Sequence, residues 1–541
     1  MNYTAHLDTF TRDGLPPPDQ LPECLFDLPE LQFPSQVNCA AALLDDAVHV
    51  RGWGDRVALR FEEGGCWTYR MLLAQANRIA QVLREDMGLV AGNRVLLRGA
   101  NHPMLAAAWF GVVKAGGVAV TTMPLLRAKE LRQIVQKARI SHAICEASRA
   151  DELQLAAMAC PDLQSVCFYH DESAQGLEAL MASKDGCFDN VPTAADDACL
   201  IAFTSGTTGQ PKATVHFHRD VLAICQCFPQ YILRADATDV FSGSPPLGFT
   251  FGLGGLLLFP LSIGASTVLL AKGAPEQLRT AIAQHQISVL FTAPTAYRAM
   301  AAVAKAAELR SLRKCVSAGE VLPVSTRNSW RQLTGIELID GIGATELLHI
   351  FVSADEQQVR PGATGKAIPG YQARVVDELG RPLPPYQVGR LAVKGPTGCR
   401  YLDDPRQADY VQGGWNLTGD AYYMDEDGYL FYQARVDDLI ISAGYNIAPV
   451  EIEDILLQHP AVAECAVVGQ PDADRNMVVC AHVVPRPGFE PSEQLTQDLQ
   501  QYVKQQIAPY KYPRVIEYHT ALPRNETGKL QRFRLRHAAM A

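Results

Sequence analysis

The alternation of apolar and polar residues predicts short strands separated by helices over much of the chain. Apolar runs typical of buried strands occur at 94–97, 118–120, 199–203, 288–292 and 314–317. Segments 104–114 and 295–308 have the periodicity of helices that bury one face. Strands that alternate with helices form parallel sheets covered by helices. We therefore predict an α/β fold with two parallel-type α/β subdomains.

The pattern changes towards the C-terminus. Residues 370–433 contain short strands separated by Gly, Pro and Asp, which predicts a small β-barrel or antiparallel sheet. After it, two helical segments and two apolar strands predict a compact α+β domain; they lie at 449–458, 493–506, 462–468 and 478–484. We place an N-terminal core at 1–434 and a smaller, mobile C-terminal domain at 435–541.

Composition narrows the class of protein. The 541 residues exceed what one hydrophobic core organises. With 48 basic and 58 acidic residues, the net charge of -10 argues against a nucleic-acid partner. The 14 cysteines include no C-x-x-C pair, which is typical of reduced thiols. The N-terminus lacks a signal-peptide pattern, and no apolar run reaches the roughly 18 residues of a membrane span. We expect a cytoplasmic protein without a membrane partner.

A run of hydroxyl residues and glycines follows the apolar segment 199–203 and ends in a lysine. It comprises Thr204, Ser205, Gly206, Thr207, Thr208, Gly209, Gln210, Pro211 and Lys212. Glycine permits torsions closed to other residues, so consecutive N–H groups can converge on phosphate oxygens. The spacing differs from the P-loop of kinases and GTPases, in which the lysine directly follows a glycine. We interpret the run as a phosphate-binding loop, although its composition alone fits a surface loop equally well.

Four further blocks follow in a fixed order. They are Gly-Ile-Gly-Ala-Thr-Glu at 341–346, Trp-Asn-Leu-Thr-Gly-Asp at 415–420, Arg-Val-Asp-Asp-Leu-Ile at 435–440 and Leu-Pro-Arg-Asn-Glu-Thr-Gly-Lys at 522–529. Together with the loop they resemble the motifs of the adenylate-forming superfamily, which includes acyl-CoA synthetases, adenylation domains and luciferases. The similarity runs from about residue 67 to residue 532.

The resemblance implies that the chain is an ATP- and Mg²⁺-dependent enzyme. It implies that Thr345 contacts the α-phosphate, that Glu346 holds Mg²⁺, and that the loop from Thr204 to Lys212 covers the β- and γ-phosphates. Asp420 and Arg435 are the expected ribose ligands, since a carboxylate accepts two O–H donors at once. The expected remaining ATP-binding residues are Gly319, Glu320, Asp340, Gly341 and Ile342. Ile342 replaces the aromatic residue common in the family, and Asp340 is a candidate acceptor for the adenine amino group.

The C-terminal blocks imply two half-reactions that alternate by domain rotation. Lys529 is expected to stabilise charge during acyl-adenylate formation, together with Thr345 and Glu346. Asp437 occupies the family's hinge position. Rotation about it would withdraw Lys529 and bring Ser442, Ala443 and Gly444 to a tunnel for the CoA thiol.

The segments expected to line the acyl pocket favour a compact aromatic acid. Phe249 and Ile342 are bulky, which disfavours a long fatty chain. Phe249, Gly343, Ala344 and His349 are the expected pocket residues. Residues 317–320 and 340–351 resemble those of benzoate-CoA ligases, and residues 3–10 and 15–17 resemble those of 2-aminobenzoate-CoA ligases. His349 is equally well explained as a structural histidine, and we do not expect His216 and His218 to bind metal, because no ligand neighbours them in sequence.

The predicted function is an aryl-CoA ligase that uses ATP, Mg²⁺ and CoA, with 2-aminobenzoate or benzoate favoured. A free-standing adenylation enzyme that loads a carrier protein is the alternative, because both acceptors present the same thiol arm. Only 12 residues follow Lys529, so we expect no fused carrier domain. A non-catalytic adenylate-binding protein is disfavoured, because Lys529, Glu346 and Asp420 are all present.

Overall fold

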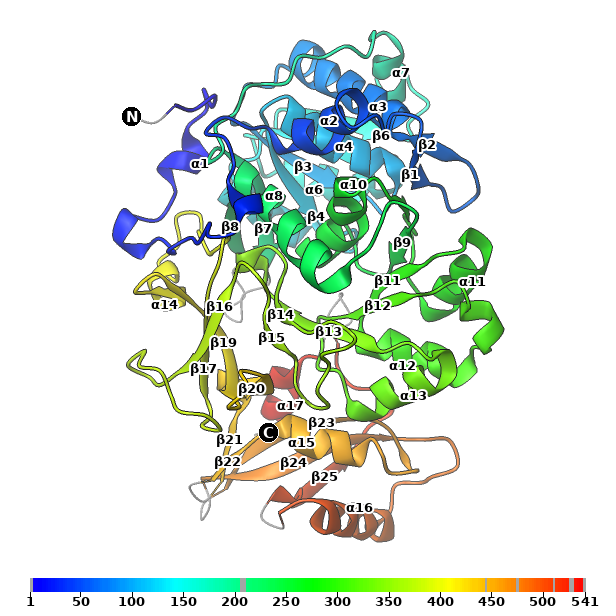
Figure 1. Cartoon of the computed structure of the whole chain (residues 1–541), viewed down its shortest axis with the longest axis vertical. Helices are drawn as coiled ribbons and strands as arrows, with labels where there is room; N and C mark the ends of the chain where they lie inside the picture. The colour runs from blue at the N-terminus through cyan, green and yellow to red at the C-terminus, as the bar shows by residue number, and fades with distance from the viewer. Residues whose placement is uncertain are drawn as a thin grey trace.

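The computed structural model of the chain describes residues 3–204, 211–442, 445–472, 476–508, 511–524 and 530–538. Within these residues the chain forms two large α/β sheets, an antiparallel sheet beside them and a smaller C-terminal domain, which lies at the bottom of Figure 1. This arrangement confirms the predicted fold class.

The first large sheet has six strands in the order β6-β5-β3-β4-β7-β8. Their bounds are β3 Arg94–Arg98, β4 Val118–Thr122, β5 His142–Glu146, β6 Ser165–Tyr169, β7 Ala198–Thr204 and β8 Lys212–Phe217. Neighbouring strands are parallel, except that β8 pairs antiparallel with β7. The ends of β7 and β8 that face each other are Thr204 and Lys212, the two limits of the predicted phosphate loop.

The helices of this subdomain are α3 Tyr69–Gln81, α4 Pro103–Lys114, α5 Ala128–Lys137, α6 Ala150–Ala157, α7 Leu177–Ala182 and α8 His218–Phe228. The start of α4 is determined locally. Pro103 occupies its first turn, where no amide is needed, and the His102 ring accepts a hydrogen bond from the Met104 amide at 3.1 Å. Every residue of α4 is buried, as its apolar sequence predicts.

The second large sheet has nine strands in the order β15-β14-β13-β12-β11-β9-β10-β1-β2. Its parallel central strands are β1 Val57–Arg60, β9 Val240–Gly243, β10 Ser266–Val268, β11 Val289–Thr292, β12 Lys314–Ser317 and β13 Leu338–Gly343. The antiparallel edge strands are β2 Cys66–Thr68, β14 Ile350–Ser353 and β15 Lys366–Ala367. Its helices are α9 Thr250–Leu253, α10 Phe259–Ser262, α11 Pro275–His285, α12 Pro294–Val303 and α13 Val324–Thr334.

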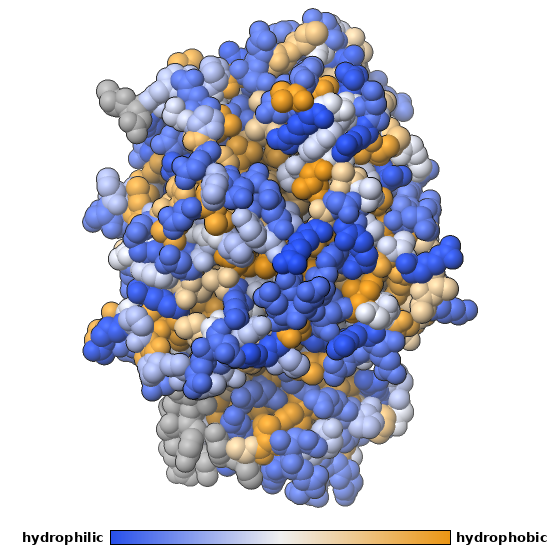
Figure 2. Space-filling model, viewed as in Figure 1, coloured by the Kyte–Doolittle hydropathy of each residue, from blue (hydrophilic) through white to orange (hydrophobic). Residues whose placement is uncertain are grey.

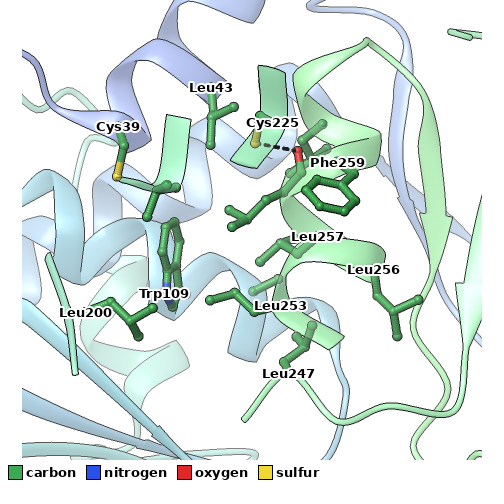
Figure 3. Close-up of a cluster of buried hydrophobic side chains, with 14 of the residues drawn as sticks. Cys39, Leu43, Trp109, Leu200, Cys225, Leu247, Leu253, Leu256, Leu257 and Phe259 are labelled. Carbon is green, nitrogen blue, oxygen red and sulfur yellow. Dashed lines mark hydrogen bonds between the residues drawn. The ribbon is translucent and has the colours of Figure 1, made fainter. Parts of the chain in front are cut away.

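The two large sheets share one hydrophobic core. Figure 3 shows Trp109 of α4 between Leu200 of β7 and Leu253 of α9. Trp109 is 2% exposed, and Leu257, in the helical segment η7 Gly254–Leu258, is fully buried. Burial of one such side chain contributes about 1.5–3 kcal/mol. The shared core therefore holds the two sheets together. It fixes their positions relative to each other at the site described below.

The third sheet is antiparallel, as predicted for residues 370–433. Its strands are β16 Gln372–Val376, β17 Gly389–Lys394, β18 Val411–Gln412, β19 Trp415–Met424 and β20 Leu430–Arg435. One short helix, α14 Gln407–Tyr410, precedes β18. In Figure 1 these strands stand beside β14 and β15 of the nine-stranded sheet.

The C-terminal domain has its own core. A three-stranded sheet of β23 Val462–Asp472, β24 Asn476–Pro485 and β25 Val515–Tyr518 packs against α15 Pro449–Leu456 and α16 Glu493–Gln506. The helix α17 Arg532–Ala538 contacts β23 through the opposite face, where Leu535 packs with Cys480. A small hairpin of β21 Ile440–Ser442 and β22 Tyr445–Ile447 precedes these elements.

One predicted helix is shorter than expected. The sequence pattern predicts a helix over 295–308, but α12 ends at Val303 and a separate 3₁₀ turn, η8, runs over Ala306–Leu309. The Glu308 side chain accepts the Lys305 amide at 2.9 Å, which starts the new turn and brings Leu309 into the core at 2% exposure. Burial of Leu309 therefore overrides the helical preference of the alanine-rich segment.

The N-terminal segment lies along the first sheet and contains only short helical turns, among them α1 Phe10–Asp13. Asp8 pairs with the buried Arg94 at 2.5 Å, and Asp197 accepts the Ala5 amide at 2.9 Å. The face shown in Figure 2 is mostly hydrophilic, with hydrophobic side chains in small groups. Among the helices described, none combines the length and hydropathy needed to cross a bilayer.

Candidate active site

The predicted nucleotide residues gather at the carboxyl ends of β11, β12 and β13. Ser317 at the end of β12 pairs with Asp340 of β13, and Thr292 at the end of β11 pairs with Ser317. The Gly319–Glu320 turn therefore lies beside the strand that carries Asp340, Gly341, Ile342 and Gly343. Ligands of open α/β sheets bind outside the carboxyl ends of the strands.

A buried polar chain joins the two large sheets directly beneath Thr345. The His216 Nε2–H of β8 donates to the Thr345 carbonyl at 2.8 Å, in the turn η9 Thr345–Leu347. His216 Nδ1 lies 3.8 Å from Asp220, which accepts from Arg400 at 2.7 Å. Although burial acts in the opposite direction, Arg400 and His216 hold the pKa of Asp220 below its usual value. This support for Thr345 escaped sequence reasoning.

A second polar chain links the phosphate loop to Glu346. The Lys212 Nζ donates to the Tyr401 hydroxyl at 3.1 Å, and that hydroxyl donates to Glu346 Oε1 at 2.5 Å. Tyr401 is 1% exposed and packs edge-on against Tyr410 at 5.7 Å between ring centroids. Burial and the Glu346 carboxylate raise the pKa of Tyr401, so its hydroxyl stays protonated and serves as a donor. The chain therefore brings Lys212 and Glu346 together.

Tyr401 was also missed by sequence reasoning. It lies 189 positions from Lys212, in a segment that pairs with β8 through the Val215 amide and the Arg400 carbonyl at 2.8 Å. The hydroxyl of the neighbouring Tyr410 is buried and has no hydrogen-bond partner in the described part of the chain. The two neighbouring tyrosines therefore differ in their hydroxyl groups: that of Tyr401 is hydrogen-bonded, whereas that of Tyr410 has no partner among the described residues.

The expected ribose ligands form an ion pair across two strands. Asp420 of β19 is the register partner of Arg435 of β20, and their side chains meet at 2.9 Å. Arg435 also donates to the Thr418 carbonyl at 3.0 Å. Burial raises the pKa of Asp420, while Arg435 acts in the opposite direction. Gly419 has φ +76°, and a Cβ there would lie 2.7 Å from the Arg435 guanidinium, so glycine keeps space for the arginine.

Asp340 is the second unusual carboxyl group of the site. Its Oδ1 is buried without a hydrogen-bond partner among the described residues, and burial raises its pKa to about 7. Such an atom is costly to leave unsatisfied. Ile342, two residues further on, is partly buried and packs against the main core. Gly319 has φ +91° and open space where a Cβ would stand.

The predicted acyl-pocket loop is held from the first sheet. The Asn101 side chain donates to the Pro245 carbonyl at 3.0 Å and accepts the Leu247 amide at 2.7 Å. Phe249 follows as the residue before α9 and is half-buried. Gly343, another predicted pocket residue, lets β13 approach β14 closely, since a Cβ there would lie 2.8 Å from the His349 carbonyl. Ala344 is half-buried beside Gly343.

His349 lies in a cage of phenylalanines. Its ring is 4.4 Å from Phe259, 5.7 Å from Phe228 and Phe251, and 6.5 Å from Phe291, between centroids. The side chain is buried, and neither ring nitrogen reaches hydrogen-bonding geometry with any described residue. Burial lowers the pKa of His349 to about 3, while the neighbouring main chain of Phe251 acts in the opposite direction. The imidazole is therefore neutral and has two unused polar atoms.

Arg524 of the small domain contacts the large region near the nucleotide residues. Arg524 lies 3.4 Å from Glu320 of the large region and 2.9 Å from Glu464 of β23. Lys529 itself lies outside the described residues, as do Ser205, Gly206, Thr207, Thr208 and Gly209 of the loop and Ala443 and Gly444. Asp437 falls in the turn η10 Val436–Asp438, and Ser442 is buried at the end of β21.

A surface pocket outside the predicted nucleotide site is lined largely by charged side chains. It is lined at its centre by Arg313, Lys314, Arg327, Arg331, Glu337 and Glu356, at the amino ends of β12 and β13. Each of its basic side chains has a carboxylate partner; Arg327, for example, pairs with Glu337 at 2.8 Å. It lies at the opposite end of the sheet from the residues described above, and we do not assign it a catalytic role.

Comparison with known proteins identifies the class. The family model of AMP-binding enzymes matches residues 47–400, and that of the AMP-binding enzyme C-terminal domain matches residues 451–529. The chain belongs to this adenylate-forming superfamily, and it is an AMP-forming acyl-CoA synthetase.

Particular relatives narrow the comparison. The benzoate–CoA ligase of Thauera aromatica is 35% identical over 520 residues, which cover 94% of this chain and 98% of that protein. The crystal structure of the anthranilate CoA ligase AuaEII in complex with anthranoyl-AMP has a TM-score of 0.90 at 32% identity and covers 95% of this chain and 99% of that one. A benzoate CoA ligase from Burkholderia xenovorans LB400 has a TM-score of 0.85 at 31% identity, with 92% and 100% covered. This chain is close to benzoate- and aminobenzoate-CoA ligases.

Proposed function

We propose that the protein is an aryl-CoA ligase that converts 2-aminobenzoate or benzoate to its CoA thioester, with release of AMP and pyrophosphate. The observation that carries the proposal is the His349 cage: an aromatic enclosure with a neutral, unpartnered imidazole follows directly on the Thr345–Glu346 turn. The similarity to ligases of anthranilate and benzoate supports the same substrate class.

The chemistry explains why ATP is consumed. A free carboxylate is a poor electrophile, because its charge repels nucleophiles and oxide is a poor leaving group. In the first half-reaction a carboxylate oxygen attacks the α-phosphorus of ATP, the bond to the β-phosphate oxygen breaks, and pyrophosphate leaves. In the second, the CoA thiol loses its proton and its sulfur attacks the acyl carbon, and AMP leaves with the bonding electrons.

Glu346 is the proposed ligand of Mg²⁺. Tyr401 engages its Oε1, which leaves Oε2 available, and an oxygen ligand suits this hard cation. When bound, Mg²⁺ would neutralise phosphate charge. Thr345 is proposed to contact the α-phosphate from a turn whose carbonyl is held by His216. The loop from Thr204 through Ser205, Gly206, Thr207, Thr208 and Gly209 to Lys212 is proposed to bind the outer phosphates.

The nucleoside is proposed to lie between the ribose pair and Asp340. Asp420 would accept the ribose hydroxyls with Arg435 beside it, while the unpartnered Oδ1 of Asp340 would accept the adenine amino group. Ile342 would pack on the adenine face. Gly319, Glu320 and Gly341 would line the same end of the site.

The two proposed half-reactions require two positions of the small domain. We divide the chain at residue 434, with Asp437 as the hinge. The Arg524–Glu320 contact supports an arrangement in which the Lys529 segment faces the nucleotide residues, as adenylation requires. Rotation about Asp437 would replace it with the segment of Ser442, Ala443 and Gly444 for CoA.

The acyl pocket is proposed to consist of Phe249, Gly343, Ala344 and His349. A buried imidazole without partners can accept from, or donate to, a substituent on the substrate ring. A pocket built for such a hydrogen bond discriminates strongly against ligands that lack it. This argument favours 2-aminobenzoate over benzoate as the preferred acid.

The test is a substrate panel with the full-length protein, ATP and Mg²⁺. AMP release would be measured with benzoate, 2-aminobenzoate, hydroxybenzoates, a short aliphatic acid and a fatty acid, each with and without CoA. We expect CoA-dependent turnover confined to the aryl acids. Pyrophosphate exchange with an aryl acid but no turnover with CoA would instead indicate loading of a carrier protein. Preference for the fatty acid would contradict the proposed pocket.

A further inference from the structure

Three side chains capable of binding a metal lie together on the small-domain sheet, apart from the adenylation site. His482 of β24 and Glu517 of β25 are register partners in a parallel pair of strands. His519 follows Glu517 by two residues, so its side chain lies on the same face of the sheet. The arrangement is therefore created by strand pairing between two segments 35 residues apart.

The three ligand atoms form a compact triangle. His482 Nδ1 lies 2.9 Å from His519 Nε2 and 3.3 Å from Glu517 Oε2, and His519 Nε2 lies 3.9 Å from the same carboxylate oxygen. A triangle with these sides has a circumscribed radius of about 2.0 Å, so one point is equidistant from the three atoms at about the length of a zinc–nitrogen or zinc–oxygen bond. The separations of the three atoms are therefore those of ligands around one ion.

The surroundings suit His482 as a ligand through Nδ1. Its other nitrogen, Nε2, lies 3.7 Å from Cys480 Sγ, so Nε2 can carry the proton and donate to sulfur, while an ion at Nδ1 would replace the hydrogen bond between Nδ1 and His519 Nε2. Cys480 is not part of the triangle of ligand atoms formed by His482, Glu517 and His519.

The site is open on one side. His482 is fully buried, but the side chains of Glu517 and His519 are 35% and 28% exposed, which provides an entry path from solvent and room for a water ligand. Two imidazoles and one carboxylate are the ligand set of zinc and related transition metals, whereas Mg²⁺ prefers oxygen ligands alone. We propose that His482, Glu517 and His519 bind one divalent transition-metal ion, for which Zn²⁺ is the probe.

The position of the site gives the ion a structural role. The same face of the sheet carries Cys480, which packs with Leu522, the first residue of the lysine motif, and with Leu535 of α17. An ion that ties β24 to β25 would stabilise the surface against which Leu522 packs. Since a ligand that binds only the folded state raises stability, Zn²⁺ should raise the melting temperature of the chain.

A second group of potential ligands provides the competing explanation for any bound metal. Cys39, Cys199 and His218 lie together in the core and are all buried. His218 Nδ1 already accepts the Cys39 amide at 3.1 Å, which occupies its lone pair. The two sites differ in ligand chemistry, since one contains thiols and the other does not, and this difference can be measured.

The experiment uses tag-free, full-length protein stripped of metal, because a histidine tag would bind the probe. Zn²⁺ would be titrated in the absence of ATP by calorimetry, with Co²⁺ as a spectroscopic substitute. We expect one ion per chain and a Co²⁺ spectrum with visible ligand-field bands but no thiolate charge-transfer band. The part-exposed positions are the ones to change: His519→Gln and Glu517→Gln should each weaken binding at least about tenfold.

His459→Gln is the matched control, because His459 lies in the same domain but contacts Tyr502 on the α15–α16 side of the sheet. It should leave Zn²⁺ affinity and the metal-induced rise in melting temperature unchanged, and circular dichroism would confirm that each variant is folded. Absence of stoichiometric binding, equal affinity in His519→Gln, or a thiolate band in the Co²⁺ spectrum would each overturn the proposal.

Discussion

The two ends of the proposed catalytic site, on either side of the Thr345–Glu346 turn, are constructed in opposite ways. On the phosphate side, Lys212, Tyr401 and Glu346 form a chain of hydrogen bonds whose separations are 3.1 and 2.5 Å. On the acyl side, His349 is surrounded by phenylalanine rings and makes no hydrogen bond within the described structure.

This difference follows from what each end is proposed to hold. A triphosphate and its metal ion carry high charge, so the groups that meet them must be fixed in geometry and protonation state before binding. A flat aromatic acid is selected by shape and by few polar contacts. Changes at the phosphate side should therefore lower turnover for every acid, whereas changes at the acyl side should alter which acid is used.

The largest effect is expected for Lys529→Ala. Loss of the ammonium that offsets charge in the adenylation transition state should lower acyl-adenylate formation about 10³-fold or more. Thioester formation from supplied acyl-adenylate should remain near the wild-type rate, because the proposed domain rotation withdraws the lysine in that step. The two half-reactions would be measured separately by pyrophosphate release and by thioester yield, with Lys504→Ala on α16 as the control. Equal losses in both steps would refute the role.

Tyr401→Phe should have the next largest effect. It removes the hydroxyl that joins Lys212 to Glu346 but retains the ring, so we expect kcat for adenylation to fall about 10²-fold for all acids. The required concentration of Mg²⁺ should also rise. Tyr410→Phe is the control, because the hydroxyl it removes is buried without a partner in the described chain. Similar activities of the two variants would show that the polar chain is not needed.

His349→Leu tests the acyl side. Removal of both ring nitrogens should lower kcat/KM for 2-aminobenzoate about tenfold relative to benzoate, while ATP affinity stays constant. Stability should increase, because a buried polar group without partners costs about 1–3 kcal/mol. The pKa of His349 is about 3, so its imidazole stays neutral between pH 6 and 9. Titration of His349 should therefore not change the preference of the wild-type enzyme for 2-aminobenzoate over benzoate in this range. An unchanged substrate ratio would place His349 outside the pocket.

The smallest effect is expected for Asp340→Asn, at the proposed adenine end of the site. The pKa of Asp340 is about 7 in the folded protein, above the value of about 3.9 in an unfolded chain. The folded state thus binds more protons between these values, so its stability falls as pH rises through this window and the loss is complete above pH 7.

Asparagine does not titrate, so Asp340→Asn should raise the melting temperature by a few degrees at pH 8 relative to wild type and by less at pH 5. The KM for ATP should rise only a few-fold, because one acceptor oxygen remains. Scanning fluorimetry at the two pH values and ATP titration would measure both effects. A larger gain at pH 5 than at pH 8 would contradict the raised pKa.

Much of the fold could be predicted because its signals are local. The helix expected over 493–506 coincides with α16, and the strand expected over 314–317 coincides with β12. The break after Val303 could not be predicted, because it depends on the burial of Leu309 and not on the alanine-rich segment itself. The ordered motifs identified the family for the same reason, since each is a short run of fixed residue types.

The candidate site was predicted less completely. The motif residues were identified, but Tyr401 and the chain from Arg400 through Asp220 to His216 were not. None of these residues has a distinctive local pattern, and each acquires its role only when a distant segment packs beside it. Asn101, which holds the loop before Phe249, belongs to the same group.

The sequence by itself determined the fold class, the order of the motifs and the class of reaction, because residue type and spacing along the chain are enough to specify them. Tertiary structure decided which groups touch. It placed Cys39 and Cys199 around His218, where the sequence shows no ligand neighbour, and it brought His482 to Glu517 and His519. Distances of 3–4 Å between side chains depend on strand register and core packing, which no local pattern encodes.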